Sequence, residues 1–174
     1  MVEGPEPALA EVVVAVQRGD RRAFAILYAR FRRVVHALAL ARVPAGDADD
    51  VVQEVFAEVW ARVGSLREPA AFPGWVVTMA RSRAIDAARR GRGRDFAVGD
   101  RQVEPPPRAE AVAALAAIRA LSETYRETLI MRLVEGLTGP EIAERTGMTP
   151  ESVRVHLHRG MTLLRERLGG GGEP

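Results

Sequence analysis

The sequence contains no cysteine among its 174 residues. Disulfide bonds, thiol redox chemistry and cysteine–zinc sites are therefore excluded within the chain, which suits a reducing compartment. The sequence also lacks an apolar run of membrane-spanning length and a basic leader followed by an apolar segment. We therefore expect a cytoplasmic protein that does not insert into a membrane.

Lysine is absent as well, so all 25 basic side chains are arginines. They stand against 23 acidic residues, for a net charge of +2. Arginine suits the recognition of phosphate and guanine, although an all-arginine chain can also reflect the base composition of a genome. The distribution of charge along the chain is therefore more informative than its sum.

Aromatic residues make up only 5% of the chain, and no alternating pattern of β-branched and aromatic residues indicates a hairpin. The apolar residues, 47% of the chain, are largely alanine and valine and recur at spacings of three and four. This pattern predicts an all-α fold. Helices are expected near residues 11–18, 21–41, 47–63, 72–92, 109–120, 123–135, 139–145 and 150–168.

A proline-rich segment over residues 95–107 divides the predicted helices into two groups. Three consecutive prolines in this segment exclude a packed helix, so an extended linker is expected here. The sequence thus predicts two small helical domains, over residues 1–94 and 108–168. A glycine-rich flexible tail is expected over 169–174.

Residues 137–159 carry the most informative pattern, which is that of two short helices joined by a fixed turn. Thr138 and Glu141, three residues apart, predict a capping box at the start of the first helix. Gly147 suits the left-handed backbone at its end, and Thr149 is expected to cap the second helix. These signals have the spacing of a DNA-reading helix-turn-helix, whereas the alternative is an ordinary helical hairpin.

The outward face of the second helix offers hydrogen-bond donors and acceptors that suit the major groove of DNA. In the alternative interpretation these polar side chains are merely solvated. The residues of this face are Glu151, Ser152, Arg154, His156, His158 and Arg159.

An earlier predicted helix opens with five acidic residues and no basic one. Asp47, Asp49 and Asp50 complement the dipole at the start of that helix and need no partner. Glu54 and Glu58 lie beyond the reach of this effect. Two interpretations stay open for them, a solvated face and a docking surface for a basic helix of another protein.

Six arginines follow between residues 81 and 94, against the single acidic residue Asp86. Such a local excess attracts polyanions such as DNA. The alternative is a solubilising helix end, in which Asp86 pairs with Arg90 one turn later. Phe72 and Trp75 precede the arginines, and their rings either stack on an unpaired base or lie in the core.

In this order the motifs resemble those of an extracytoplasmic-function, group IV, RNA polymerase sigma factor of the sigma-70 family, over roughly residues 21–168. Residues 47–60 are similar to region 2.2 of that family, residues 72–86 to regions 2.3 and 2.4, and residues 122–168 to region 4. The resemblance implies a fold of two helical domains, one of region 2 and one of region 4, joined by a linker.

The resemblance also implies a function. The protein would be a promoter-specificity subunit that binds core RNA polymerase, recognises the minus-ten and minus-thirty-five elements of promoter DNA and promotes DNA melting. It would not be an enzyme and would need no cofactor and no metal. An anti-sigma factor is expected as a further partner.

Each matching position has an implied role. The residues expected to dock on core polymerase are Asp50, Gln53, Glu54 and Phe56. The residues expected at the minus-ten element are Phe72, Trp75, Arg81, Ser82, Arg83, Asp86, Arg89 and Arg90. The residues expected at the minus-thirty-five element are Glu151, Ser152, Arg154, Val155, His156 and Arg159. Ser82 and His156 stand where the family usually has asparagine and arginine, and a hydroxyl offers a base fewer hydrogen bonds than an amide.

Two other functions come from different classes. A helix-turn-helix regulator that acts without forming a holoenzyme would explain residues 137–159 but not the acidic helix. An enzyme with a helical active site would need catalytic or metal-binding residues. The three histidines have no metal-ligand spacing with a glutamate, and the chain has no cysteine to add to them.

Overall fold

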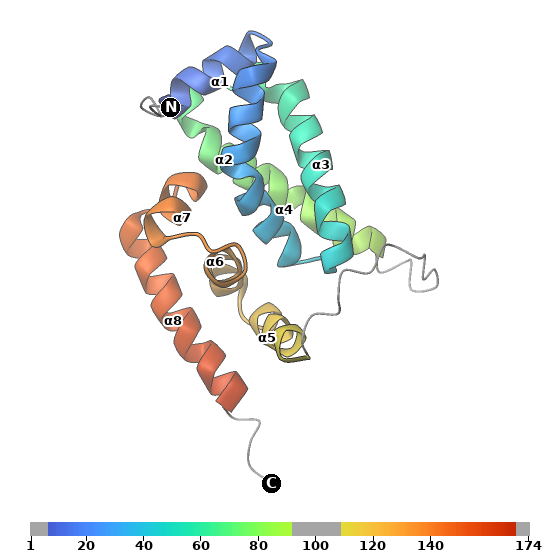
Figure 1. The fold of residues 1–174 in the computed structure, drawn as a ribbon, viewed down its shortest axis with the longest axis vertical. Coiled ribbons are helices and arrows are strands. Elements are labelled where there is room, and N and C mark those ends of the chain that lie inside the picture. The colour runs from blue at the N-terminus through green and yellow to red at the C-terminus, as the bar shows by residue number, and fades with distance from the viewer. Residues whose placement is uncertain (1–6, 92–108, 170–174) are drawn as a thin grey trace, which may run out of the picture.

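The computed structural model describes residues 7–91 and 109–169, and it contains no strand among these residues. The first stretch forms α1 (Leu9–Gln17), α2 (Arg21–Leu40), α3 (Ala45–Arg62), η1 (Val63–Ser65), η2 (Pro69–Ala71) and α4 (Phe72–Gly91). The second stretch forms α5 (Ala109–Arg119), α6 (Glu123–Leu133), α7 (Gly139–Thr146) and α8 (Pro150–Gly169). The predicted all-α fold is thereby confirmed (Figure 1).

The helix ends predicted from the sequence agree with the structure within two residues at every end. Three other expectations lie outside the described residues. These are the extended linker over 95–107, the tail beyond Gly169, and the contribution of Arg92 and Arg94 to the basic helix.

Helix α2 lies at the centre of the first half of the molecule and packs against α1, α3 and α4. Asp20 starts this helix because its carboxylate accepts hydrogen bonds from the backbone amides of Arg22 and Ala23, at 2.7 and 3.1 Å. Phe31, in the middle of α2, is fully buried, and its ring meets the ring of Phe72 edge-on at 5.0 Å. This pair joins α2 to the start of α4.

The second half contains the expected helix-turn-helix. Thr138 and Glu141 form the predicted capping box at the start of α7, and Gly147 ends α7 with a φ of +74°. The Thr149 hydroxyl accepts a hydrogen bond from the Ser152 amide at 3.1 Å, as a cap of α8 should. The sequence also predicts Ser122 as the cap of α6, since serine favours this position. That prediction is wrong, because the Ser122 side chain makes no capping hydrogen bond.

Thr138 and Ser122, which both directly precede a helix, provide a matched test of local helix chemistry. Thr138→Ala is expected to lower the free energy of unfolding by about 1 kcal/mol, because amides at the start of α7 lose their acceptor. Ser122→Ala should change it by much less, since the Ser122 hydroxyl caps nothing. Urea unfolding followed by circular dichroism measures both. Equal losses in the two variants would contradict the assignment.

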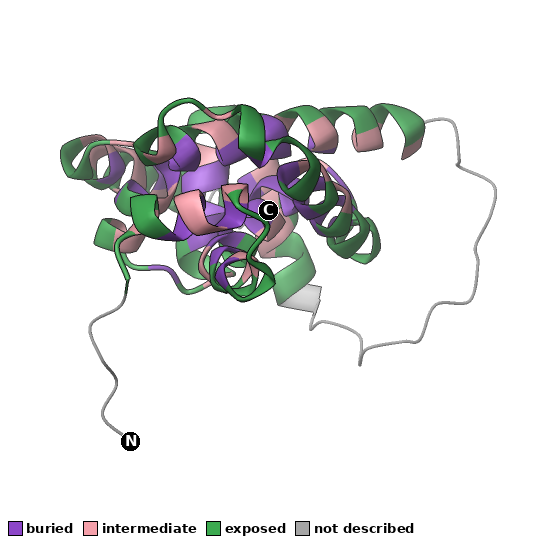
Figure 2. Cartoon of the chain, turned by 90° about the horizontal axis from the view of Figure 1, so that it is seen from above, coloured by how far each residue is buried: buried purple, intermediate pink, exposed green. Residues whose placement is uncertain are grey.

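The two halves pack against each other through α2 and α4 on one side and α6 and α7 on the other (Figure 1). One continuous cluster of buried apolar residues includes members of both halves, among them Phe31 and Leu129. Figure 2 shows the buried residues gathered where the helices face one another, with exposed residues around them. The arrangement of the described residues is therefore closed, with a core shared between the halves.

Candidate nucleic-acid interface

The predicted recognition helix, α8, presents a polar outer face near its start. Glu151 and Arg154 are almost fully exposed and lie 3.5 Å apart, and Arg159 is exposed one turn and a half further along. Ser152 is half-buried, and its hydroxyl accepts a hydrogen bond from the Thr149 hydroxyl at 2.8 Å. Among the residues expected to read the minus-thirty-five element, Glu151, Arg154 and Arg159 are thus the most accessible.

His156 faces away from this accessible row. Its ring meets the ring of Tyr125 edge-on, with centroids 6.0 Å apart, and its buried Nδ1 atom has no hydrogen-bond partner among the described residues. Val155 is also half-buried. Two of the six predicted minus-thirty-five residues therefore contribute to the packing of α8 as well as to its surface.

The depth at which α8 packs is set by Gly160. This buried glycine faces α6, and a Cβ atom at this position would lie 3.2 Å from the Leu129 side chain and 3.3 Å from that of Tyr125. Because such contacts are tighter than ordinary van der Waals separation, glycine lets the two helices approach closely. The half of α8 beyond its reading face is in this way anchored to α6.

The basic face of α4 is held by acidic residues of α3. Arg83 Nε donates to Glu58 at 2.6 Å, and Arg90 Nη2 donates to Glu54 at 3.0 Å. In the alternative interpretation Arg90 would pair with Asp86, whereas in the structure it pairs with Glu54 of α3. Glu54 and Glu58 thus both bind arginines of their own chain, and a docking role for Glu54 stays a prediction.

Glu58 is the best-connected of these carboxylates. It accepts hydrogen bonds from Arg83 and from Arg62, and only 14% of its side chain is exposed. The hydrogen bond from Arg83 is the main reason why the pKa of Glu58 lies below its ordinary value of 4.5, with burial opposing the shift. The same bond raises the pKa of Arg83.

Replacing Glu58 by Gln should lower the free energy of unfolding by about 1 kcal/mol at about pH 7, because a charge-assisted hydrogen bond is lost. The folded pKa is depressed, so this stabilisation is present above the unfolded pKa and disappears as the pH falls through the folded one. Urea unfolding at about pH 7 and about pH 3 measures the difference. E166Q, at an exposed site of α8, is the control, and an equal E58Q effect at both pH values would contradict the prediction.

The predicted aromatic residues of the site differ in exposure. Phe72 is fully buried against Phe31, and Phe56 is 3% exposed and packs on Tyr28 at 4.6 Å. Neither ring is accessible to a base or to a partner protein in this arrangement, which corrects the roles that the resemblance implied for them. Trp75 is half-buried beside Phe72, with centroids 5.8 Å apart.

The remaining predicted residues lie on exposed surfaces. Asp50 and Gln53 are exposed on α3, while Ser82, Asp86 and Arg89 are exposed on α4. Arg89 Nη1 lies 3.9 Å from Asp86. The structure thus brings the predicted minus-ten residues together along one helix, and it sets the predicted docking residues on the neighbouring helix.

Arg81 has a partner that the sequence did not indicate. Its Nη2 atom donates to Oε2 of Glu127 at 2.7 Å, and Glu127 is buried on α6 in the other half of the molecule. Hydrogen bonding by Glu127 raises the pKa of Arg81. No sequence signal marked Glu127, since its partners Arg42 and Arg81 are distant along the chain.

Two protein-family models match this chain. Sigma-70 region 2 matches residues 27–94, and Sigma-70, region 4 matches residues 111–164. The ECF RNA polymerase sigma factor SigK of Mycobacterium sp. (strain KMS) is 30% identical over 169 residues, covering 88% of this chain and 87% of the relative. The chain belongs to the extracytoplasmic-function sigma factors of the sigma-70 family. A protein of this family confers promoter specificity on RNA polymerase.

Other relatives agree with this membership. The ECF RNA polymerase sigma-E factor of Escherichia coli (strain K12) is 29% identical over 172 residues, with 88% of this chain and 90% of the relative covered. The solved structure of CnrH in complex with the cytosolic domain of CnrY superposes with a TM-score of 0.62 at 23% identity. It covers 95% of this chain and 100% of that one, and the likeness shows that the fold is shared.

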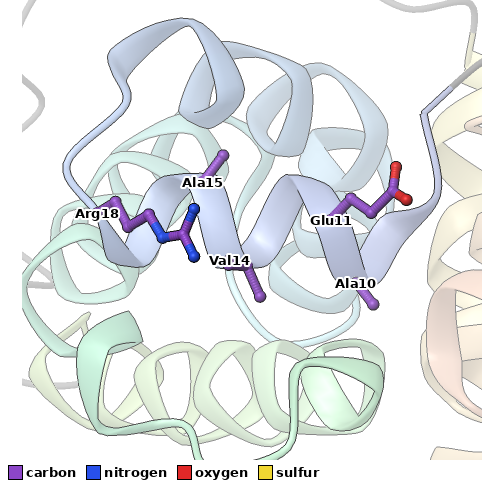
Figure 3. Close-up of a pocket in the computed structure, with 5 residues that line it drawn as sticks. All are labelled: Ala10, Glu11, Val14, Ala15 and Arg18. Carbon is purple, nitrogen blue, oxygen red and sulfur yellow. The ribbon is translucent and has the colours of Figure 1, made fainter.

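The described part of this sigma factor holds no group of acidic and histidine side chains that could bind a metal ion. Of its helices, none in the described ranges is both long enough and apolar enough to cross a membrane. A shallow depression of about 370 Å³ lies along α1, lined by Ala10, Val14 and Ala15 with Glu11 and Arg18 at its ends (Figure 3).

Proposed function

We propose that this sigma factor binds core RNA polymerase, recognises a minus-ten and a minus-thirty-five promoter element, and promotes DNA melting for transcription initiation. The observation that carries the proposal is that one chain combines an exposed recognition helix, α8, with a basic helix, α4, supported by an acidic one, α3. The residues 1–94 would form the minus-ten and polymerase-binding domain, and residues 108–168 the minus-thirty-five domain. Residues 95–107 would link them.

Reading of the minus-thirty-five element is assigned to the exposed start of α8. Arg154 and Arg159 carry forked donors that suit the two acceptors of guanine in the major groove, and Glu151 can accept from a cytosine amino group. Ser152, Val155 and His156 would contribute at the edge of this surface. Each well-placed arginine pair with guanine discriminates by about 1 to 3 kcal/mol.

Recognition of the minus-ten element is assigned to α4. Ser82, Asp86 and Arg89 are exposed along it, and Trp75 presents part of its ring near the start of the helix. Such a ring can stack on an unpaired base, which is worth about 1 to 3 kcal/mol. Arg81, Arg83 and Arg90 would contact phosphates after exchanging their present carboxylate partners for DNA. These three arginines would provide the electrostatic attraction of the proposed surface for DNA.

Docking on core polymerase is assigned to the exposed face of α3. Asp50 and Gln53 lie on this face, and Glu54 borders it with 39% of its side chain exposed. Acidic side chains of this kind suit a basic partner helix and speed its approach.

An anti-sigma factor is proposed as a further partner of this cytoplasmic protein. The supporting observation is that the structural relative CnrH was solved in complex with the cytosolic domain of CnrY. In this chain the proposed polymerase-docking face of α3 and the reading face of α8 are both accessible in the described structure. A protein that covered either face would block the corresponding step.

The decisive experiment is run-off transcription with purified core polymerase and a library of random promoters. Defined start sites preceded by two common elements are expected. A pull-down of core polymerase without DNA separates this function from that of a regulator which acts without a holoenzyme. Failure to bind core polymerase and to direct any start site would refute the proposal.

A further inference from the structure

Glu127 is a buried carboxylate that two arginines of the other half of the chain share. It lies on α6 with a 3% exposed fraction. Its Oε1 atom accepts from Arg42 Nη2 at 2.5 Å, and its Oε2 atom accepts from Arg81 Nη2 at 2.7 Å. Arg81 Nε lies 3.1 Å from both carboxylate oxygens. Arg42 comes from the residues after α2 and Arg81 from α4, so one side chain joins three segments.

A carboxylate at this depth depends strongly on its partners. Removing a charge from water is costly unless an opposite charge and hydrogen bonds replace the lost solvation. Here both partners belong to the region 2 half, so Glu127 is satisfied only while α6 lies against α2 and α4. Arg42 is itself 8% exposed and also binds Glu123. The arrangement ties the burial of these groups to closure of the molecule.

Other polar contacts cross the same interface. Arg119 donates to the carbonyl oxygens of Leu40 and Val43 at 2.9 and 2.7 Å, and Arg126 donates to that of Ala41 at 3.2 Å. None of these engages a residue of the proposed DNA surface. Glu127 differs from them because it occupies Arg81.

The closed arrangement also places the turn of the helix-turn-helix over the start of α4. A Cβ atom on Gly147 would lie 3.7 Å from the backbone nitrogen of Gly74, next to Trp75. The proposed minus-ten surface is thus approached by region 4 at two points, this turn and the carboxylate of Glu127.

Binding to both promoter elements requires the halves to separate. Elements named for positions about 25 base pairs apart lie roughly 85 Å apart on B-form DNA, at about 3.4 Å per base pair. Helices α4 and α8 have 20 residues each and are therefore only about 30 Å long. Since α7 touches α4 in the closed form, the two reading surfaces cannot span that distance without opening.

We propose that Glu127 is an internal latch, which holds the sigma factor closed and occupies Arg81 in place of a DNA phosphate. The inference rests on the proposed function in two respects, the assignment of Arg81 to phosphate and the binding of two promoter elements. Closure through Glu127 stands on the geometry alone. The latch opens when a competing anion binds Arg81 in place of Glu127, or when polymerase binds the separated halves.

The test uses the full chain with two fluorophores. Because the chain has no cysteine, dyes attach only at introduced ones, at Gly64→Cys in η1 and Arg165→Cys in α8. Both sites are exposed, and a Cβ atom at Gly64 meets nothing within 4 Å. E127Q is compared with E166Q, which makes the same change of charge at an exposed position of α8.

In E127Q, energy transfer between the dyes should fall, and affinity for a mixed-sequence DNA duplex should rise about tenfold, as expected when a closed population near ten to one is released. E166Q should match the parent in energy transfer. Unchanged energy transfer in a folded E127Q would overturn the latch. Lower energy transfer without tighter DNA binding would support the latch and count against Arg81 as a phosphate contact, and so against that part of the proposed function.

If circular dichroism shows that E127Q does not fold, the labelled parent chain still tests the latch. Titration with the same duplex at low salt should lower energy transfer in the parent, because phosphate competes with Glu127 for Arg81. DNA that binds the parent without changing energy transfer would overturn the proposal. The polymerase pull-down described above is independent of these measurements, so loss of the proposed function and loss of the latch are distinguishable.

Discussion

Inserting about five base pairs between the two promoter elements should lower transcription by this sigma factor about 100-fold or more. The insertion rotates one element by about half a helical turn relative to the other. Because a tether joins the two domains, the second contact gains an effective concentration only when the spacing lets both bind together. Single base changes, at about 1 to 3 kcal/mol each, should on average cost less than the loss of one entire element.

The experiment compares run-off transcription from promoters that differ only in spacer length. The matched control carries the same five base pairs upstream of the minus-thirty-five element, where both elements keep their relative position. It should transcribe like the parent promoter. Equal transcription over a wide range of spacers would contradict simultaneous reading by two domains.

Replacing Phe31 by Ala is expected to lower the free energy of unfolding by about 3 to 5 kcal/mol. Phe31 is fully buried at the centre of α2, where its ring meets Phe72 edge-on at 5.0 Å. The substitution removes this contact and leaves a cavity between α2 and α4. Since domains of this size are stable by roughly 5 to 15 kcal/mol, the loss would be a large share of the total.

Urea unfolding of F31A followed by circular dichroism measures this loss. The control is I26A on the same helix, because Ile26 is 38% exposed and its truncation opens no enclosed cavity. A much smaller effect is expected there. Similar losses in the two variants would show that Phe31 does not anchor the core as the structure indicates.

The sequence predicted the helices well because their ends depend on local chemistry. Thr138 and Glu141 satisfy the free amides at the start of α7, and Gly147 adopts the left-handed backbone at its end. These interactions span three or four residues, so the sequence alone contains them. Val153 and Leu157, four residues apart, also predict the inner face of α8. Val153 is buried there and Leu157 is half-buried.

The pairing of charged residues could not be predicted in the same way. Glu58 and Arg83 are 25 positions apart, and Glu127 and Arg42 are 85 positions apart. Their contacts depend on how whole helices pack, which no local pattern specifies. For this reason Glu54 and Glu58 were open to two interpretations, although the structure pairs both with arginines of α4.

Phe56 illustrates a different limit. It lies four residues after Val52 and three before Val59, a spacing that predicts an inner helix face. Family resemblance implied a role in docking instead, and the structure places Phe56 in the core. The repeat of apolar residues was the better guide because it reports the burial of this chain's own side chains. The roles of the exposed residues in DNA and polymerase binding stay predictions for experiment.

The C-terminal end of α2 is completed by the other half of the molecule. Arg119 and Arg126 provide donors to the carbonyl oxygens of Leu40, Ala41 and Val43. If the halves part, water must replace these guanidinium groups and the last turn of α2 should fray. Amide hydrogen exchange in that turn would then accelerate. Its rate would report, without any dye, the fraction of molecules in which the two halves are apart.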